Sequence, residues 1–191
     1  MFTLRQPTEQ RIRDYLSAQV SQAFSYDDVG CTRGEPAAKR GWNIDRQRVL
    51  LGRGREVFEA AKQAISNWRM FPQEVARVCW PEPPQTGLVV GVLYKVWLLP
   101  VWILFPARVV WVMDEQVGEI HRFGFAYGTL PDHPERGEER FVVEWNDADD
   151  SVWYDLLAVS QPTHWLARIG YPYTRYEQAR FRRLSAAAMR K

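Results

Sequence analysis

The sequence has few of the residues that build metal centres or disulfide frameworks. Its 191 residues include two cysteines and three histidines. Cys31 and Cys79 lie far apart, and neither belongs to a CxxC pair or to a Cys/His ligand spacing, so we expect no zinc site and no other bound metal or cofactor. Since a reducing cytosol keeps thiols free, we expect both cysteines to be unpaired.

The sequence also lacks a strong excess of one charge and a long hydrophobic run. Its formal net charge is +2, which argues against a nucleic-acid partner. The first 13 residues contain no apolar core typical of a signal peptide. The most apolar stretch, Gly87–Met113, is interrupted by Lys95 and Arg108, whereas a membrane-spanning helix needs about 20 apolar residues. We therefore expect a cytoplasmic protein without a membrane span.

Aromatic residues are abundant. They make up 14% of the chain, with nine tryptophans. Aromatic side chains bury large areas, and a buried indole N–H needs a hydrogen-bond partner. The count is compatible with a cavity lined by rings and equally with a core that the rings fill, and the sequence leaves both interpretations open.

Helical spacing of apolar residues occurs near both ends of the chain. Thr8 suits the N-cap of a first helix. The segment Arg55–Arg69 keeps the i, i+3, i+4, i+7 apolar pattern of a second helix. The segment from Pro162 to Lys191 is expected to be the long C-terminal helix, with Pro172 kinking or restarting it.

Between these helices the apolar pattern has period two. Short turns rich in Pro, Asp and Asn separate the apolar stretches. Sequential strands with short turns form an antiparallel sheet, and the helices must cover one of its faces. We expect one α+β domain over residues 1–191, with about six to seven strands curved around the C-terminal helix. The predicted strands are Trp42–Leu51, Val75–Trp80, Gly87–Leu98, Val101–Asp114, Glu119–Gly128, Glu138–Trp145 and Ser151–Ser160.

Charged residues inside apolar strands are the first candidates for chemistry. Alternation places Glu139 on the same face as Phe141, which is expected to point inward. Arg108 lies in the most apolar strand. Because an unpaired buried charge is costly, Arg108 and Glu139 are expected to pair or to contact a ligand; a bulge that turns Glu139 to solvent, and an Arg108 that reaches solvent at a sheet edge, remain alternatives.

The three histidines do not form a recognisable catalytic group. His121, His133 and His164 are each expected to be surface or capping residues, and no serine or cysteine occupies a nucleophile elbow. The C-terminal helix carries many arginines with interleaved aromatic residues. Such a helix usually packs its aromatic stripe on the sheet and leaves its arginines in water, although it is also compatible with a membrane-surface module.

Three groups of residues resemble a known family. The matching segments are Arg48–Gly54 with Val57, Phe58 and Trp68–Phe71; Arg122–Phe141; and Ser151–Ala158 with Ser160–Pro162 and Leu166–Pro172. Together they are similar to the DUF1990 family, also called UPF0548, over about residues 26–189, with residues 1–25 as an N-terminal helical extension. The family has no established activity, so the resemblance implies no catalytic residue.

The element order also resembles the helix-grip fold of START/Bet v 1-like (SRPBCC) proteins, which often encloses an apolar cavity. This resemblance implies binding of an apolar or aromatic small molecule or lipid between sheet and helix. One alternative is a cyclase-type or hydrolase-type enzyme that uses Glu139 or His133 as acid or base, and another is an interaction module that acts through the basic helix. The expected ligand contacts are Arg108, Tyr127, Glu139, Tyr154, Trp165, Ile169, Tyr173 and Tyr176.

Overall fold

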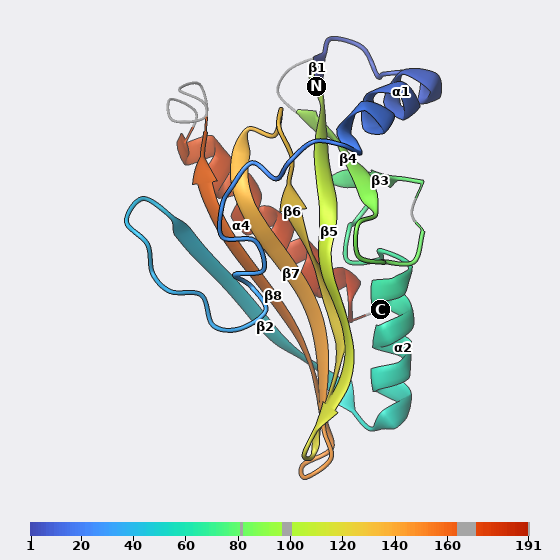
Figure 1. The fold of residues 1–191 in the computed structure, drawn as a ribbon. Helices are drawn as coiled ribbons and strands as arrows, with labels where there is room; N and C mark the ends of the chain where they lie inside the picture. The colour runs from blue at the N-terminus through green and yellow to red at the C-terminus, as the bar shows by residue number, and fades with distance from the viewer. Residues whose placement is uncertain (81, 97–100, 164–170, 191) are drawn as a thin grey trace.

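One antiparallel sheet dominates the protein (Figure 1). The computed structural model describes residues 1–80, 82–96, 101–163 and 171–190. Within them the sheet has eight strands, ordered β2-β8-β7-β6-β5-β4-β3, with β1 paired to β5. The strands are β1 (Phe2–Thr3), β2 (Asn43–Arg53), β3 (Ala76–Cys79), β4 (Val89–Val96), β5 (Val101–Val117), β6 (Ile120–Thr129), β7 (Glu135–Asn146) and β8 (Ser151–Pro162).

Three helices pack on this sheet in the described part of the chain: α1 (Glu9–Gln19), α2 (Arg55–Ser66) and α4 (Tyr171–Ala188). Figure 1 shows the strands curving around α4, and this arrangement confirms the predicted α+β helix-grip architecture. At the start of α1, Thr8 accepts a hydrogen bond from the backbone N–H of Arg11 at 3.3 Å, as its predicted N-cap role requires.

The period-two pattern located the strands, but it misplaced several boundaries, including those where β7 begins and β8 ends. Strand β7 begins at Glu135 instead of Glu138, because Glu135 pairs with Pro162 at the end of β8. Pro162 therefore belongs to a strand, and its predicted place in the C-terminal helix is wrong. A proline is tolerated at the end of a strand because few ladder hydrogen bonds are lost there. The result is a longer β7 that carries Glu135 into the sheet.

The main core fills the concave face of the sheet. Phe125, Phe141 and Tyr154 point from the strands toward α2 and α4 and are fully buried. Phe71 contacts both the sheet and α4, since its ring centroid lies 5.5 Å from that of Phe141 on β7 and 5.2 Å from that of Phe181 on α4. Ring pairs at such distances add to the energy of apolar burial.

Helix α1 covers the opposite, convex face. Ile12 and Leu16 form a second core with Leu93 and Leu104. Gly91 makes this approach possible, because a Cβ there would lie 2.9 Å from Leu104 and 3.0 Å from Leu16. The N-terminal extension is therefore packed against the sheet.

No described helix is both long and apolar enough to cross a bilayer. Cys31 is partly exposed, Cys79 is buried beside α1, and the two are unpaired in the structure.

Candidate functional site

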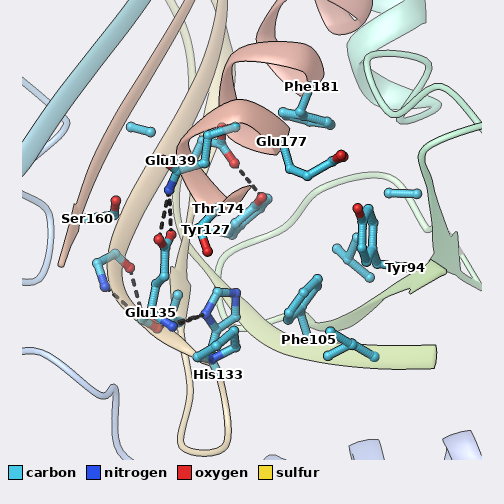
Figure 2. A pocket seen from close by; sticks show the side chains of 18 of the residues that line it. Tyr94, Phe105, Tyr127, His133, Glu135, Glu139, Ser160, Thr174, Glu177 and Phe181 are labelled. Atoms are coloured by element: carbon cyan, nitrogen blue, oxygen red, sulfur yellow. Dashed lines mark hydrogen bonds between the residues drawn. The ribbon is translucent and has the colours of Figure 1, made fainter. Parts of the chain in front are cut away.

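A cavity of about 1120 Å³ lies between the concave face and α4. Its walls are mostly apolar and aromatic, and Figure 2 shows their side chains from close by. Phe71 contributes from the α2–β3 connection, Val92 from β4, Phe105 from β5, and Phe181 from α4. A curved sheet creates this space because its two ends bend toward the helix without filling the volume between them.

Glu139 and Tyr127 form the main polar group on the sheet side of the cavity. They are partners across β6 and β7, and the Tyr127 hydroxyl donates to Glu139 Oε2 at 2.5 Å. Burial raises the pKa of Glu139 to about 7, although the hydrogen bond from Tyr127 and the nearby Arg182 lower it. The inward orientation predicted for Glu139 is confirmed.

Glu135 and His133 lie at the end of the cavity formed by the β6–β7 turn (Figure 2). Both Glu135 carboxyl oxygens accept hydrogen bonds from Gln178 Nε2 at 2.8 Å, and burial raises the pKa of Glu135. Burial lowers the pKa of His133 to about 4, so its ring is neutral at pH 7. Of the two expected roles for His133, the surface role is wrong, because its ring faces Phe105 at 5.0 Å inside the cavity, whereas the capping role is present, because Nδ1 accepts the backbone N–H of Glu135 at 3.1 Å.

Helix α4 contributes one face to the cavity. Tyr173, Glu177 and Phe181 are spaced four residues apart and therefore lie on one side of the helix. The Tyr173 hydroxyl lies 3.1 Å from that of Tyr94 on β4. Glu177 Oε2 accepts from Arg180 at 3.2 Å, whereas its Oε1 is buried and has no hydrogen-bond partner among the described residues.

Two arginines of α4 turn toward the sheet. Arg175 forms an ion pair with Asp45 of β2, with Nη2 donating to Oδ1 at 2.7 Å, and Arg182 reaches the same carboxylate at 3.3 Å. The side chain of Asp45 is 10% exposed, so this pairing holds the edge strand to the helix. The expectation that the helix leaves its arginines in water is wrong for these two.

Arg108 does not line the cavity. It donates to the main-chain carbonyls of Gln19, Val20 and Gln22, at 2.7–2.9 Å, at the end of α1. In β5, Phe105 and Ala107 face the concave core, so alternation directs Arg108 to the convex face. The expected pairing of Arg108 with Glu139 is wrong, and the cation instead binds carbonyls at a helix C-terminus, where positive charge is stabilised.

The other expected contacts separate into three groups. Tyr127 and Tyr173 line the cavity, as described above. Tyr154 is fully buried and lies 2.8 Å from the Ser185 hydroxyl, so it connects the sheet to α4 away from the lining. Tyr176 is 58% exposed on the outer side of α4. Trp165 and Ile169, with His164, lie outside the described residues.

Tryptophan was a misleading signal for the cavity. No described tryptophan lines it; tyrosines and phenylalanines do. Trp145 stacks on His121 at 4.8 Å outside the cavity, and that histidine also lies 2.8 Å from Asp147. Trp153 lies under the guanidinium of Arg48.

Five of the six acidic residues that line the cavity were not among the expected contacts: Asp45, Asp132, Glu135, Glu138 and Glu177. Glu177 was detectable, because it lies four residues after the predicted contact Tyr173. Glu135 was hidden by the assignment of its segment to a turn. Glu138 also contributes to the lining, but its carboxylate points to the other face of the sheet, where it accepts from the Tyr26 hydroxyl at 2.7 Å and from the 26–32 loop. Within the described residues no group of three metal-ligating side chains was found.

Comparisons with known proteins support the architecture and the family. The chain is 34% identical to a UPF0548 protein of Dictyostelium discoideum, over 95% of this chain and 90% of that protein. It is 38% identical to a UPF0548 protein of Arabidopsis thaliana, over 80% of this chain and 74% of that protein.

A crystal structure of a hypothetical protein from Helicobacter pylori shares the fold. It superposes with a TM-score of 0.51 at 11% identity, covering 87% of this chain and 94% of the other. The family model described as a domain of unknown function, DUF1990, matches residues 25–188. The chain therefore belongs to the DUF1990 family.

Proposed function

We propose that this protein binds an apolar or aromatic small molecule or a lipid between the sheet and α4. The observation that carries this proposal is the cavity of about 1120 Å³ with mostly apolar walls and a few inward polar groups. Pockets for small molecules are usually roughly 300–1,000 Å³ and combine apolar walls with a small number of orienting polar groups. The two polar pairs, Tyr127–Glu139 and Glu135–Gln178, supply such groups here.

A pair of matched substitutions tests whether the cavity binds apolar molecules. Ala158 of β8 lines the cavity, whereas Ala179 of α4 is exposed. Ala158→Trp places an indole in the binding volume, and Ala179→Trp adds the same group at the surface. Binding of neutral N-phenyl-1-naphthylamine, measured by its fluorescence, should weaken at least about tenfold in the first variant and stay unchanged in the second.

Two results would contradict the proposal. One is that the unmodified protein does not bind the neutral probe at concentrations below those at which the probe aggregates. The other is that both tryptophan variants bind it as well as the unmodified protein does. Circular dichroism and urea unfolding of both variants establish that each is folded before binding is compared.

A second candidate function, acid–base catalysis, has one observation in its favour. A carboxyl group with a pKa of about 7 that faces a cavity can both accept and release a proton near neutral pH, and Glu139 is such a group. His133 is less suited, because a pKa of about 4 makes its ring a weak base that is almost never protonated at pH 7. Mass spectrometry of molecules that co-purify with the protein tests this candidate. Catalysis requires that a co-purifying molecule be converted by the unmodified protein and not by Glu139→Gln.

The third alternative, an interaction module acting through the basic helix, is not favoured by the geometry. Arg175 and Arg182 are committed to Asp45, and Arg180 to Glu177. These contacts reduce the positive charge that α4 presents to an acidic partner or membrane.

A further inference from the structure

Carboxylates greatly outnumber basic groups in the lining of the cavity. Six acidic residues line it, whereas the cations among the described lining residues are Arg182 and the N-terminal ammonium of Met1, which donates to the Leu104 carbonyl at 2.9 Å. The carboxylate of Glu138 is already hydrogen-bonded on the other face, where Tyr26 and the 26–32 loop donate to both of its oxygens. Asp132, at the β6–β7 turn, accepts from Tyr15. The acidic groups left to face the cavity are those on β2, β7 and α4: Asp45, Glu135, Glu139 and Glu177.

The arginines of α4 that reach these groups pair with two of the four. Arg175 and Arg182 pair with Asp45, and Arg180 pairs with Glu177. The hydrogen bonds that Glu135 and Glu139 receive come from uncharged donors, the amide of Gln178 and the phenol of Tyr127. A buried carboxylate is stabilised most by a cation, and neutral donors compensate only part of its desolvation. These two groups are therefore acceptors without a cationic hydrogen-bond partner in the described part of the chain.

Glu177 provides an independent indication. Its side chain is 12% exposed, and Arg180 reaches only its Oε2, at 3.2 Å. Its Oε1 is buried and has no partner at hydrogen-bond geometry among the described residues, although the Tyr94 hydroxyl is near enough for burial and the Glu177 carboxylate together to raise the pKa of Tyr94. Buried polar atoms in folded proteins almost always have a partner, so this oxygen in the cavity wall can accept a donor from a ligand. Figure 2 shows Glu135, Glu139 and Glu177 around the same space, together with the aromatic rings of Tyr94 and Phe105.

We propose that the ligand of this cavity is an amphipathic cation, an apolar or aromatic body that carries a protonated amine. This inference rests on the proposed binding function and specifies its ligand. The apolar body occupies the space between Phe105, Val92 and Phe181. The ammonium group donates to Glu139 and Glu177, and aromatic faces nearby add cation–π attraction. A fatty acid is disfavoured, because its carboxylate would face other carboxylates at close range.

Three probes with one shared ring system test the charge requirement. They are 1-naphthylmethylamine, 1-naphthalenemethanol and 1-naphthoate, which differ in the charge of the polar group and little in the apolar body. Isothermal titration at pH 7.5, where the amine is protonated, should show the amine binding at least about tenfold more tightly than the alcohol, equivalent to about 1.4 kcal/mol. The carboxylate should bind most weakly.

Single substitutions locate the group responsible. Glu139→Gln and Glu177→Gln should each weaken amine binding about tenfold while leaving alcohol binding within about twofold. Glu74→Gln removes one negative charge from an exposed residue outside the cavity and should leave binding of all three probes unchanged. Because glutamine has nearly the same shape as glutamate, a selective effect on the amine reports charge and not packing.

The results separate the two proposals. If the neutral N-phenyl-1-naphthylamine binds but the amine binds no better than the alcohol, the cavity is correct and the cation inference is wrong. If amine preference is present but survives both substitutions, the assigned carboxylates are wrong. If neither the neutral probe nor the amine binds, the binding function fails and the inference fails with it.

Discussion

Glu139 shows how one side chain acquires a function-related property from its surroundings. Sheet register places it opposite Tyr127, so the phenol reaches its carboxylate as a cross-strand pair. The cavity and α4 then remove most bulk water from around it, and this desolvation raises its pKa to about 7. The charged groups that face it are Glu135 of β7, Asp45 of β2 and Arg182 of α4, with the Tyr154 phenol of β8 also nearby.

The raised pKa of Glu139 predicts a pH-dependent effect of Glu139→Gln on stability. Below about pH 4.5 the carboxyl is protonated in both the folded and the unfolded protein, so it does not lower the free energy of unfolding. Between about 4.5 and 7 it ionises in the unfolded chain but stays protonated in the fold, so stability falls as pH rises. At pH 8 the charged group should cost up to about 3 kcal/mol. Glu139→Gln should therefore stabilise the protein at pH 8 and have little effect at pH 4.5.

Urea unfolding at several pH values checks this prediction. Other groups titrate in the same range, including His133, whose lowered pKa makes stability rise between about pH 4 and 6.5. The stability difference between Glu139→Gln and the unmodified protein cancels such shared contributions. A difference that does not grow between pH 5 and pH 8 would show that Glu139 is not buried in the way described.

At the scale of elements, the position of α4 determines whether the cavity exists. Tyr154 on β8 lies 2.8 Å from Ser185, and both residues are fully buried near the C-terminal end of the helix. The Asp45 ion pairs hold the preceding turns of α4. The cavity lies toward the N-terminal end of the helix, where Tyr173 and Glu177 line it.

Tyr154→Phe tests the role of this contact in holding the helix. The substitution keeps the ring and leaves the Ser185 hydroxyl buried without its partner, which should cost about 1–3 kcal/mol of unfolding free energy. Tyr176→Phe is the matched control, since Tyr176 is 58% exposed and should change stability by less than about 0.5 kcal/mol. Equal effects of the two substitutions on the free energy of unfolding would show that the Tyr154–Ser185 contact does not hold α4 to the sheet.

At the scale of the whole molecule, the N-terminal extension is packed as part of the domain. Ile12 has no exposed surface, and Arg108 binds three carbonyls at the end of α1. Residues 1–24 precede the segment matched by the family model, yet they cover Leu93 and Leu104 on the convex face. We therefore predict that residues 1–191 unfold as a single cooperative unit.

Ile12→Ala measures how strongly the extension is coupled to the rest. Loss of a fully buried isoleucine should lower the unfolding free energy by about 2–5 kcal/mol, with coincident urea transitions in tryptophan fluorescence and circular dichroism. Val20→Ala, at a residue that is 63% exposed, should have little effect. If Ile12→Ala leaves the main transition unchanged and only an early, separate one shifts, the extension is an independent appendage.

Much of the fold was determined by local sequence patterns. Period-two alternation identified the strands and turned Glu139 inward with Phe141, because a strand places successive side chains on opposite faces whatever it packs against. The same rule applied along β5 would have placed Arg108 and Phe105 on opposite faces of the sheet. The wrong prediction that Arg108 points into the cavity arose because an arginine in an apolar strand was treated as an inward group. Helical spacing likewise located α1 and α2.

Only the tertiary structure decided which residues meet in the cavity. Asp45, Glu135 and Glu177 come from segments separated by 90 and 42 positions in the sequence, and no local pattern relates them. Whether a helix face points at a cavity or at solvent depends on how the helix is rotated against the sheet, which is why Tyr173 lines the cavity and Tyr176 does not. The raised pKa of Glu139 also depends on the tertiary structure, since desolvation is a property of the packed surroundings and not of the residue.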